Sequence, residues 1–273
     1  MSITTTPDDV ALKAKHRAMW ALGDYAAVAS EIIAEVGEAL VETAGITAGQ
    51  RVLDVAAGSG NAALPAARRG ADVVATDLTP ELLEVGRRAA DADGLTLTWK
   101  TADAEALPYD DGSFDAVISC VGVMFAPHHQ VAADELVRVT RSGGTIGLLS
   151  WTPEGFIGQM FATMKPYAPP PPPGAQPPPL WGHVDHVREL LGDRVTDLDA
   201  RQQALRVDFY ASGAEFRDYF KTNYGPTIAV YKAIADSPER VAALDAELAA
   251  LGDRFLSDGA MEWEYLLVTA RRG

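Results

Sequence analysis

The chain has 273 residues, with 23 Lys and Arg against 38 Asp and Glu, which gives a formal net charge of -15. Hydrophobic residues make up 48% and charged residues 22% of the sequence, a composition typical of a folded globular protein and not of a disordered or fibrous one. The acidic balance opposes binding to nucleic acid and to anionic membranes, because both need a basic protein surface.

Cysteine content and the N-terminus indicate the cellular setting. The single cysteine, Cys120, excludes an intramolecular disulfide and a cysteine-rich zinc site. The first ten residues lack the basic and apolar regions of a secretory signal. The longest nearly apolar run, residues 116–127, is shorter than the ~20 residues that cross a bilayer. We therefore expect a cytoplasmic protein that acts on a small molecule, with no nucleic-acid or membrane partner and no oligomeric state indicated.

The N-terminal half predicts a helical cover followed by an α/β sheet. Residues 8–45 carry apolar side chains at helical spacing, so we assign residues 1–49 to an N-terminal helical cover. Short β-branched runs then alternate with helical stretches over residues 50–151, which predicts a mostly parallel, doubly wound sheet. The predicted strands are residues 51–55, 72–76, 95–100, 115–120 and 145–150.

Beyond residue 151 the alternation stops. Residues 166–179 hold nine prolines, whose stiff extended backbone suits neither a central strand nor a helix. We assign residues 152–202 to an insertion and expect residues 154–186 to form a mobile lid. We assign residues 203–273 to the rest of the same domain, which completes a sheet of seven strands. Strands are expected at 204–210 and 265–270, and helices across 213–256.

A glycine turn follows the first predicted strand. The segment from Val52 to Asn61 is an apolar strand that contains Asp54 and passes through Gly58 and Gly60 into a helix. Glycines permit a tight turn and the close approach of a ligand, and the start of a helix presents free N–H groups. The next strand ends at Asp77, 19 residues after Gly58, where a carboxylate can accept both hydroxyls of a ribose. A nucleotide-like ligand is predicted.

Three details favour S-adenosylmethionine over a nicotinamide dinucleotide. Ala63 stands where the dinucleotide motif has its third glycine. Asp54 would repel a pyrophosphate but attract the ammonium group of a methionine moiety. Asp103 follows the third strand, and the segment 112–119 after it opens the fourth. An NAD(P)-dependent oxidoreductase and a non-catalytic S-adenosylmethionine-binding protein remain as alternatives.

In these motifs, residues 50–151 resemble a class I S-adenosylmethionine-dependent methyltransferase, in the style of the ubiquinone/menaquinone C-methyltransferase-like group. The resemblance implies a Rossmann-like fold and in-line methyl transfer to a small, largely apolar acceptor at O, N or activated C. The sequence departs from the family at Ala56, where glycine is usual. The cofactor contacts that the resemblance implies are Asp54, Ala56, Gly58 and Gly60 at the methionine end, Tyr25 at its carboxylate, the backbone near Cys120 at its ammonium, Asp77 at the ribose, and Leu78, Asp103 and Ala104 at the adenine.

Histidines and aromatic residues supply the remaining candidates. His128 and His129 follow the fourth strand, and either could remove a proton from the acceptor, although both could simply begin the next helix. Other histidines, His183 and His186, have the spacing of metal ligands on a helix but lack a third ligand, so no metal site is predicted. The aromatic residues proposed for an apolar acceptor pocket are Trp151, Trp181 and Tyr224.

Overall fold

The central sheet has the strand order β3-β2-β1-β4-β5-β8-β6, and a short strand, β7, pairs with β8. The computed structural model describes residues 7–273. Pairs among β1 to β5 are parallel, whereas β8 runs antiparallel to each of its neighbours. The strands are β1 (Arg51–Val55), β2 (Asp72–Asp77), β3 (Thr98–Thr101), β4 (Phe114–Cys120), β5 (Thr140–Trp151), β6 (Val195–Val207), β7 (Leu256–Ser257) and β8 (Ala260–Arg272).

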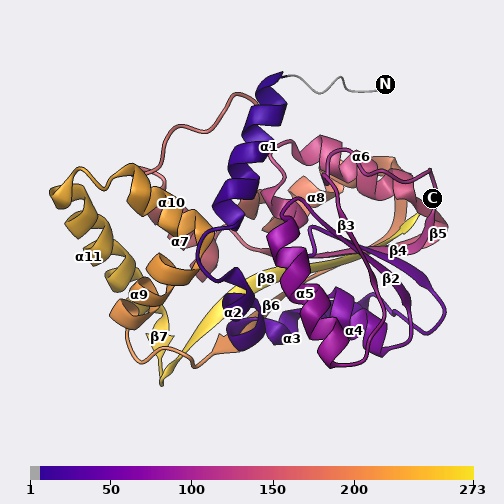
Figure 1. The fold of residues 1–273 in the computed structure, drawn as a ribbon, viewed down its shortest axis with the longest axis horizontal. Helices are drawn as coiled ribbons and strands as arrows, with labels where there is room; N and C mark the ends of the chain where they lie inside the picture. Colours follow the sequence, from indigo (N-terminus) through magenta and orange to yellow (C-terminus); the bar gives the residue numbers. More distant parts are fainter. Residues whose placement is uncertain (1–6) are drawn as a thin grey trace.

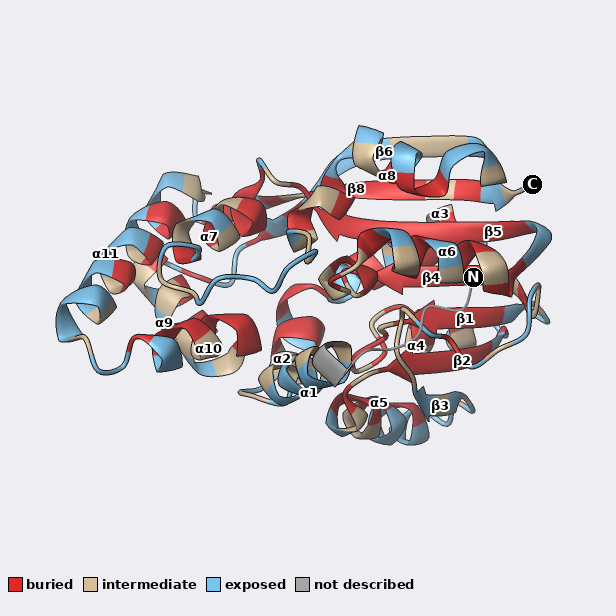
Figure 2. Ribbon diagram, turned by 90° about the horizontal axis from the view of Figure 1, so that it is seen from above, coloured by how far each residue is buried: buried red, intermediate tan, exposed pale blue. Residues whose placement is uncertain are grey.

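Helices cover both faces of the sheet, as the alternating pattern predicts (Figure 1). On one face lie α3 (Ala34–Thr43), α4 (Ala63–Arg68) and α5 (Pro80–Ala92). On the other lie α6 (His129–Val139) and α8 (Val184–Leu191). Figure 2 shows the middle strands buried along most of their length, which is why they appear in the sequence as short continuous apolar runs. The predicted doubly wound α/β fold is confirmed.

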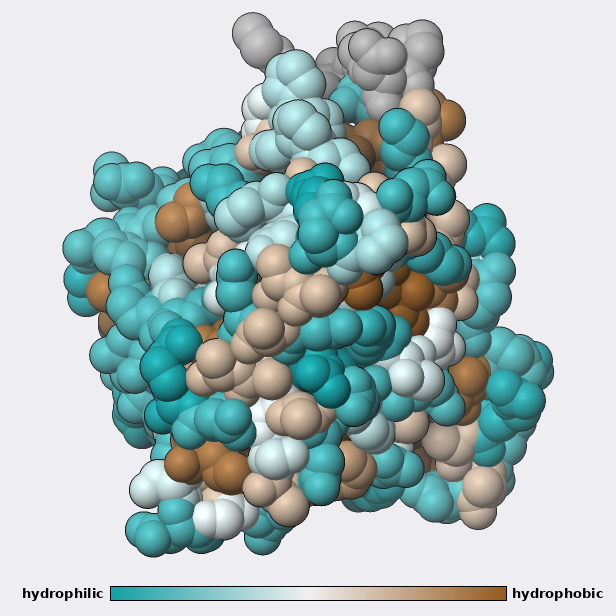
Figure 3. Space-filling view, turned by 90° about the vertical axis from the view of Figure 1, so that its left-hand side faces the viewer, coloured by the Kyte–Doolittle hydropathy of each residue, from teal (hydrophilic) through white to brown (hydrophobic). Residues whose placement is uncertain are grey.

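A second group of helices lies beyond the carboxyl ends of the parallel strands (Figures 1 and 2). Two of them, α9 and α11, approach closely because glycines face each other: a Cβ on Gly213 would lie 1.9 Å from the Ala249 carbonyl oxygen. The outer face of this group is mainly hydrophilic, with small separate apolar spots (Figure 3). Its members are α1 (Pro7–Trp20), α2 (Tyr25–Ala27), α7 (Phe156–Met164), α9 (Gly213–Asn223), α10 (Gly225–Ala233) and α11 (Pro238–Phe255).

The structure corrects several predicted bounds and the number of strands. The sheet has eight strands and not seven, because the two-residue β7 forms a hairpin with β8. Strand β6 begins at Val195, nine residues before its predicted start, and so takes in part of the assigned insertion. Strand β8 is also longer than predicted, and β3 begins three residues later.

The segment from 154 to 186 is not a loose lid throughout. Helix α7 buries Phe156 and Met160, and Trp181 lies in a buried 3-10 turn (Pro178–Gly182), so both ends of the segment contribute to the core. Its longest exposed run is 169–174, which contains five of the prolines. Among residues 7–273, no helix is both long enough and apolar enough to cross a membrane.

Candidate functional site

A cavity with about 680 Å³ of space, open to solvent, lies where β1, β2 and β4 end and α1 crosses over them. Open parallel sheets bind ligands at this edge, where the strand order reverses between β1 and β4. The lining residues are Lys13, His16, Trp20, Tyr25, Ala56, Gly58, Asp77, Leu78, Thr79, Leu82, Ala102, Asp103, Ala104, Val121, Gly122, Phe125, Ala126 and Pro127.

The turn after β1 forms the floor of the cavity. Gly58 has a φ of 56°, a backbone conformation that glycine adopts at little cost. Its N–H donates to Asp77 Oδ2 at 2.8 Å, which joins the turn to the end of β2. Gly122 must also be glycine, because a Cβ there would lie 2.2 Å from the carbonyl oxygen of Ala56. The turn, the end of β2 and the end of β4 are thus held together as one cradle.

Ala56 carries backbone strain in this turn. Its φ is 55°, in the left-handed region that costs an ordinary L-residue about 1 to 2 kcal/mol. We expect Ala56→Gly to raise the free energy of unfolding by about 1 kcal/mol, because relief of this strain exceeds the added flexibility of the unfolded chain. Chemical denaturation without ligand measures the change. Ala57→Gly, at a neighbouring position without positive φ, should instead destabilise the protein, and equal effects of both variants would contradict the strain argument.

Asp77 is oriented by two backbone amides. Its Oδ2 accepts from Gly58 N–H and its Oδ1 from Thr79 N–H, both at 2.8 Å. Burial raises the pKa of this carboxyl, while these amides oppose the shift. A carboxylate oxygen can accept more than one hydrogen bond, and the residue lines the cavity, so Asp77 can also accept from ligand hydroxyls.

Asp54 lies in β1, two residues before Ala56, and is 1% exposed. Neither of its carboxylate oxygens has a hydrogen-bond partner among the described residues. Burial raises the pKa of Asp54 to about 8, opposed by the nearby Ala63 amide and assisted by the charge of Asp77. A buried carboxylate without a partner is costly to the folded protein. A ligand cation next to it would remove that cost.

Helix α1 closes the cavity through ion pairs. Lys13 Nζ lies 2.5 Å from Asp103 Oδ2 and 2.6 Å from Glu105 Oε2. Glu105 in turn accepts from the His128 backbone N–H at 2.7 Å and lies 3.0 Å from its ring Nδ1. His16, one turn further along α1, lines the cavity, and burial lowers the pKa of its imidazole. Charged side chains of α1 and of the loop after β3 therefore meet at one rim of the cavity.

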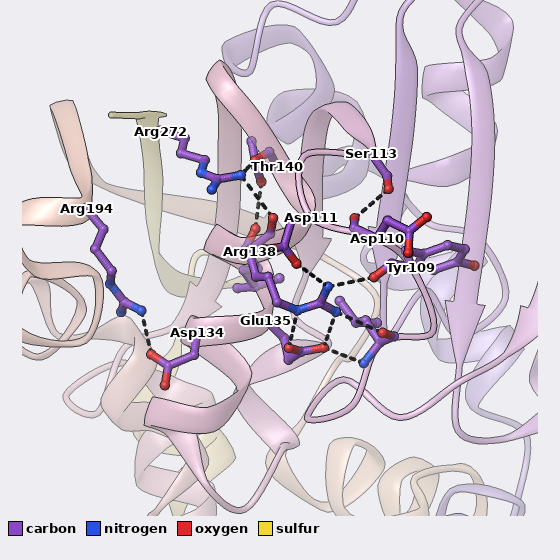
Figure 4. Close-up of polar contacts among 12 residues, drawn as sticks. Tyr109, Asp110, Asp111, Ser113, Asp134, Glu135, Arg138, Thr140, Arg194 and Arg272 are labelled. Atoms are coloured by element: carbon purple, nitrogen blue, oxygen red, sulfur yellow. Dashed lines mark hydrogen bonds and ion pairs between the residues drawn. The ribbon is translucent and has the colours of Figure 1, made fainter. Parts of the chain in front are cut away.

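The loop that carries Asp103 is fixed to helix α6 from the opposite side (Figure 4). Arg138 donates to the backbone carbonyls of Leu107 and Tyr109 at 2.9 and 2.6 Å. Its guanidinium also pairs with Glu135, which accepts from the Leu107 N–H at 2.6 Å. These bonds hold the loop in place independently of any ligand.

A second, smaller cavity adjoins the first. It has about 290 Å³ of space and is enclosed mainly by aromatic and branched side chains. Three residues, Tyr25, Val121 and Phe125, line both cavities and form the wall between them. The full lining is Tyr25, Val28, Ile33, Val121, Phe125, Trp151, Ile157, Phe220, Tyr224 and Trp263.

Most of the residues predicted to contact a cofactor line the first cavity: Tyr25, Ala56, Gly58, Asp77, Leu78, Asp103 and Ala104. Asp54, Gly60 and Cys120 lie outside its lining. Gly60 (φ 95°) instead faces the ring of Trp99, and Cys120 is buried at the end of β4, where burial raises the pKa of its thiol. The predicted acceptor residues Trp151 and Tyr224 line the second cavity.

Three further predicted residues, like Asp54, Gly60 and Cys120, fall outside both cavities. Trp181 is 1% exposed, and its ring centroid lies 5.6 Å from that of His129, so it is a core residue. His129 is fully buried, with Nδ1 2.9 Å from His186 Nε2. His128 caps α6 and is engaged by Glu105. The prediction of an acceptor base at His128 or His129 therefore finds no support in their positions. The histidine that does line the first cavity is His16.

His129 should make the protein sensitive to acid. Burial, the neighbouring His186 and the charge of His128 lower the pKa of His129 to about 3, below the ~6.5 of an exposed histidine. As the pH falls below 6.5 the unfolded chain binds a proton that the folded protein does not bind, so stability falls by up to about 1.4 kcal/mol per pH unit. We expect His129→Gln to flatten the stability profile between pH 6.5 and 4.5, measured by urea unfolding. His183→Gln, at an exposed site nearby, should keep the wild-type slope; a wild-type slope in both variants would contradict the argument.

Several lining residues were not predicted from the sequence, above all Lys13 and His16. Their ion-pair and cavity neighbours lie about 90 residues away along the chain, as the Lys13–Asp103 pair shows. The available signal was their helical spacing, since residues three apart share one face of a helix.

The residues present fit S-adenosylmethionine. Asp77 can accept from a ribose diol, the positive-φ turn at Gly58 permits close approach, and the unpaired Asp54 carboxylate lacks the cation that an amino acid ligand would bring. Together with the strand order, these features are those of a Rossmann-like methyltransferase fold. The chain contains a methyltransferase domain of the class I, S-adenosylmethionine-dependent kind.

Comparison with known proteins agrees with this assignment. The family model described as a methyltransferase domain matches residues 53–148. The "Uncharacterized protein Rv1405c" of Mycobacterium tuberculosis (strain ATCC 25618 / H37Rv) is 55% identical over 269 residues, which is 98% of each chain. A demethylmenaquinone methyltransferase of Thermus thermophilus is 42% identical over 106 residues, 38% of this chain and 48% of that protein. The structure of geranyl diphosphate methyltransferase in complex with SAM has a TM-score of 0.52 and 18% identity, covers 88% of this chain and 85% of that one, and shows the shared fold.

Proposed function

We propose that the chain transfers the methyl group of S-adenosylmethionine to a small, largely apolar acceptor held in the second cavity. The observation that carries this proposal is the shared wall, since Tyr25, Val121 and Phe125 line both cavities and so bring their contents next to each other. No charged side chain of the described residues lines the second cavity. A charged acceptor would lose its hydration there without gaining a partner.

The cofactor supplies an electrophilic methyl group on a sulfonium that already carries its own leaving group. The chain has to bind, orient and exclude water. Asp77 would fix the ribose through its two oriented oxygens, and the turn at Gly58 would set how far the ligand enters the cavity. Alignment of this kind can supply on the order of 7 to 11 kcal/mol of a barrier. We infer that alignment carries the reaction, since neither His128 nor His129 lines either cavity.

The net charge and the lining of the second cavity also bear on the acceptor. The relative from Thermus thermophilus, named for demethylmenaquinone, matches only 38% of this chain and carries no argument about the acceptor. The net charge of -15 disfavours nucleic acid as the acceptor. The apolar lining of the second cavity instead favours an uncharged compound.

A transfer assay with methyl-labelled S-adenosylmethionine tests the proposal. The purified protein is incubated with a panel of neutral phenols and enols, charged amines, carboxylates and RNA, and label is counted in each product. We expect label in neutral, solvent-extractable products. Label confined to charged acceptors or RNA would contradict the apolar-acceptor proposal, and tight cofactor binding without transfer to any acceptor would favour a non-catalytic binding protein.

Asp72→Ala serves as the control for general damage, since Asp72 is exposed at the opposite end of β2 from Asp77. It should transfer label as the wild type does. A fall in transfer with this variant would mean that the assay reports the condition of the preparation and not the site.

A further inference from the structure

Trp263, in β8, lines the second cavity and is 1% exposed, and its indole Nε1–H has no partner among the described residues. Tyr25 and Tyr224 line the same cavity, and burial raises the pKa of both phenols, so they remain neutral. A neutral phenol can donate or accept a hydrogen bond, whereas the indole N–H of Trp263 can only donate.

Four aromatic rings pack around the Trp263 indole. Phe156 stacks on it at 5.4 Å between centroids and 21° between planes, and Tyr210 is nearly parallel to it at 6.5 Å and 18°. Trp151 and Phe220 meet it in T-shaped contacts, both at 5.9 Å. An indole packed in this way has little rotational freedom, so the direction of its N–H is fixed.

Trp263 is also well placed relative to the methyl donor. It lines the part of the second cavity that the cofactor cavity does not share, whereas Tyr25 belongs to the shared wall. An acceptor that spans this cavity would present its reactive atom near Tyr25 and its other end to Trp263. Because the indole N–H donates and cannot accept, the group at that end must be an acceptor such as a carbonyl or ether oxygen.

We propose that the methyl acceptor is an uncharged ring compound with a second, hydrogen-bond-accepting oxygen remote from the methylated atom, and that Trp263 selects for this oxygen. This inference rests on the proposed function and specifies its substrate class. A ligand without the oxygen would leave the indole N–H buried and unpaired, and sites that hydrogen-bond a ligand discriminate strongly against analogues that lack the group.

The experiment uses two probes of matched shape, 4-hydroxyacetophenone and 4-ethylphenol, which differ in a carbonyl oxygen at the far end of the ring. Binding of each to the full chain saturated with S-adenosylhomocysteine is measured by calorimetry. We expect the ketone to bind about 5- to 150-fold more tightly than the ethyl compound. In Trp263→Phe this preference should disappear, while the affinity for 4-ethylphenol stays within about twofold.

Trp181→Phe is the matched control. Its indole N–H is likewise buried and without a partner, but it lies outside both cavities, so this variant should keep the wild-type preference. Equal binding of the two probes to the wild type, no binding of either, or an equal loss for both probes in Trp263→Phe would overturn the inference. The last result would show that Trp263 acts through packing alone.

A second measurement does not depend on the stability of a variant. The chain has five tryptophans, and their indole N–H signals can be followed by ¹H–¹⁵N spectroscopy of the wild type. We expect the ketone, and not the ethyl compound, to shift one indole signal downfield. Selective binding without methyl transfer to any acceptor would contradict only the proposed function, whereas transfer without oxygen-dependent binding would contradict only the role of Trp263.

Discussion

Replacing Asp77 by alanine is expected to weaken the binding of S-adenosylhomocysteine by about 1.5 to 3 kcal/mol, or roughly 10- to 150-fold. The reason is the geometry of the carboxylate, which two backbone amides hold at the end of β2, where it can also accept from ligand hydroxyls. Calorimetric titration measures the loss. NAD is expected not to bind measurably to either protein, because the buried Asp54 carboxyl offers a pyrophosphate no positive charge and would repel it once ionised.

The same substitution leaves the N–H groups of Gly58 and Thr79 without their acceptor, so part of the loss could come from a loosened turn. Asp77→Asn separates the two effects, because it keeps one acceptor oxygen and the side-chain volume. The exposed Asp72→Ala should bind as the wild type does. Unchanged affinity in Asp77→Ala, or a preference for NAD, would overturn the assignment of this carboxylate to a ribose.

The parts of the fold that could be predicted from the sequence are those in which one local pattern dominates. Strands β1 and β4 are buried on both faces and appear as continuous apolar runs, so both were placed to within a residue. Strand β6 is an edge strand with one neighbour, and most of its first ten residues are polar or exposed. Its start at Val195 was missed because hydrogen bonds to β8, and not an apolar pattern, define it.

The site residues also fall into two groups: those that a local sequence motif reveals and those that only the tertiary fold brings together. Asp77 and Gly58 were found because they lie on one motif of fixed spacing, and the structure joins them by a direct hydrogen bond. Lys13 was not found, because its pairing with Asp103 depends on how α1 crosses the sheet. Trp181 was misplaced because an aromatic side chain suits a core as well as a pocket, and composition does not distinguish the two.

The strained and unpaired groups of the site concentrate around the cofactor cavity. Ala56 and Val121 both have positive φ, at 55° and 44°, and both line it. Such conformations persist where the surrounding structure determines them, and they are common at ligand sites. Ala56 and Gly122 are coupled in this respect, since a side chain at 122 would collide with the Ala56 carbonyl. A variant of one should therefore be interpreted together with the other.

Cofactor affinity is expected to depend steeply on pH through Asp54. Because burial raises its pKa to about 8, the carboxyl is mostly protonated at pH 7 when no ligand is bound. A ligand ammonium beside it would favour the ionised form, so binding would release one proton. Affinity should then rise about eightfold from pH 6 to 7 and about twentyfold in all from pH 6 to 8. Above that it should fall, because an α-amino group with a pKa near ~7.8 loses its own charge.

Calorimetric titration with S-adenosylhomocysteine from pH 6 to 9 measures this profile, and two buffers of different ionisation enthalpy at pH 7 count the proton released. Asp54→Asn resembles the protonated carboxyl, so it should match the wild type near pH 6 and bind about 20-fold more weakly near pH 8, with no proton released. The same raised pKa means that the unliganded protein, which holds a proton that the unfolded chain has lost, becomes less stable as the pH rises from 4 to 8. A ligand that pairs with Asp54 removes this penalty, so the stabilisation by ligand should itself grow over that range. A wild-type affinity that does not change with pH would show that the ligand's cation lies elsewhere, and would leave the buried carboxylate without a function in binding.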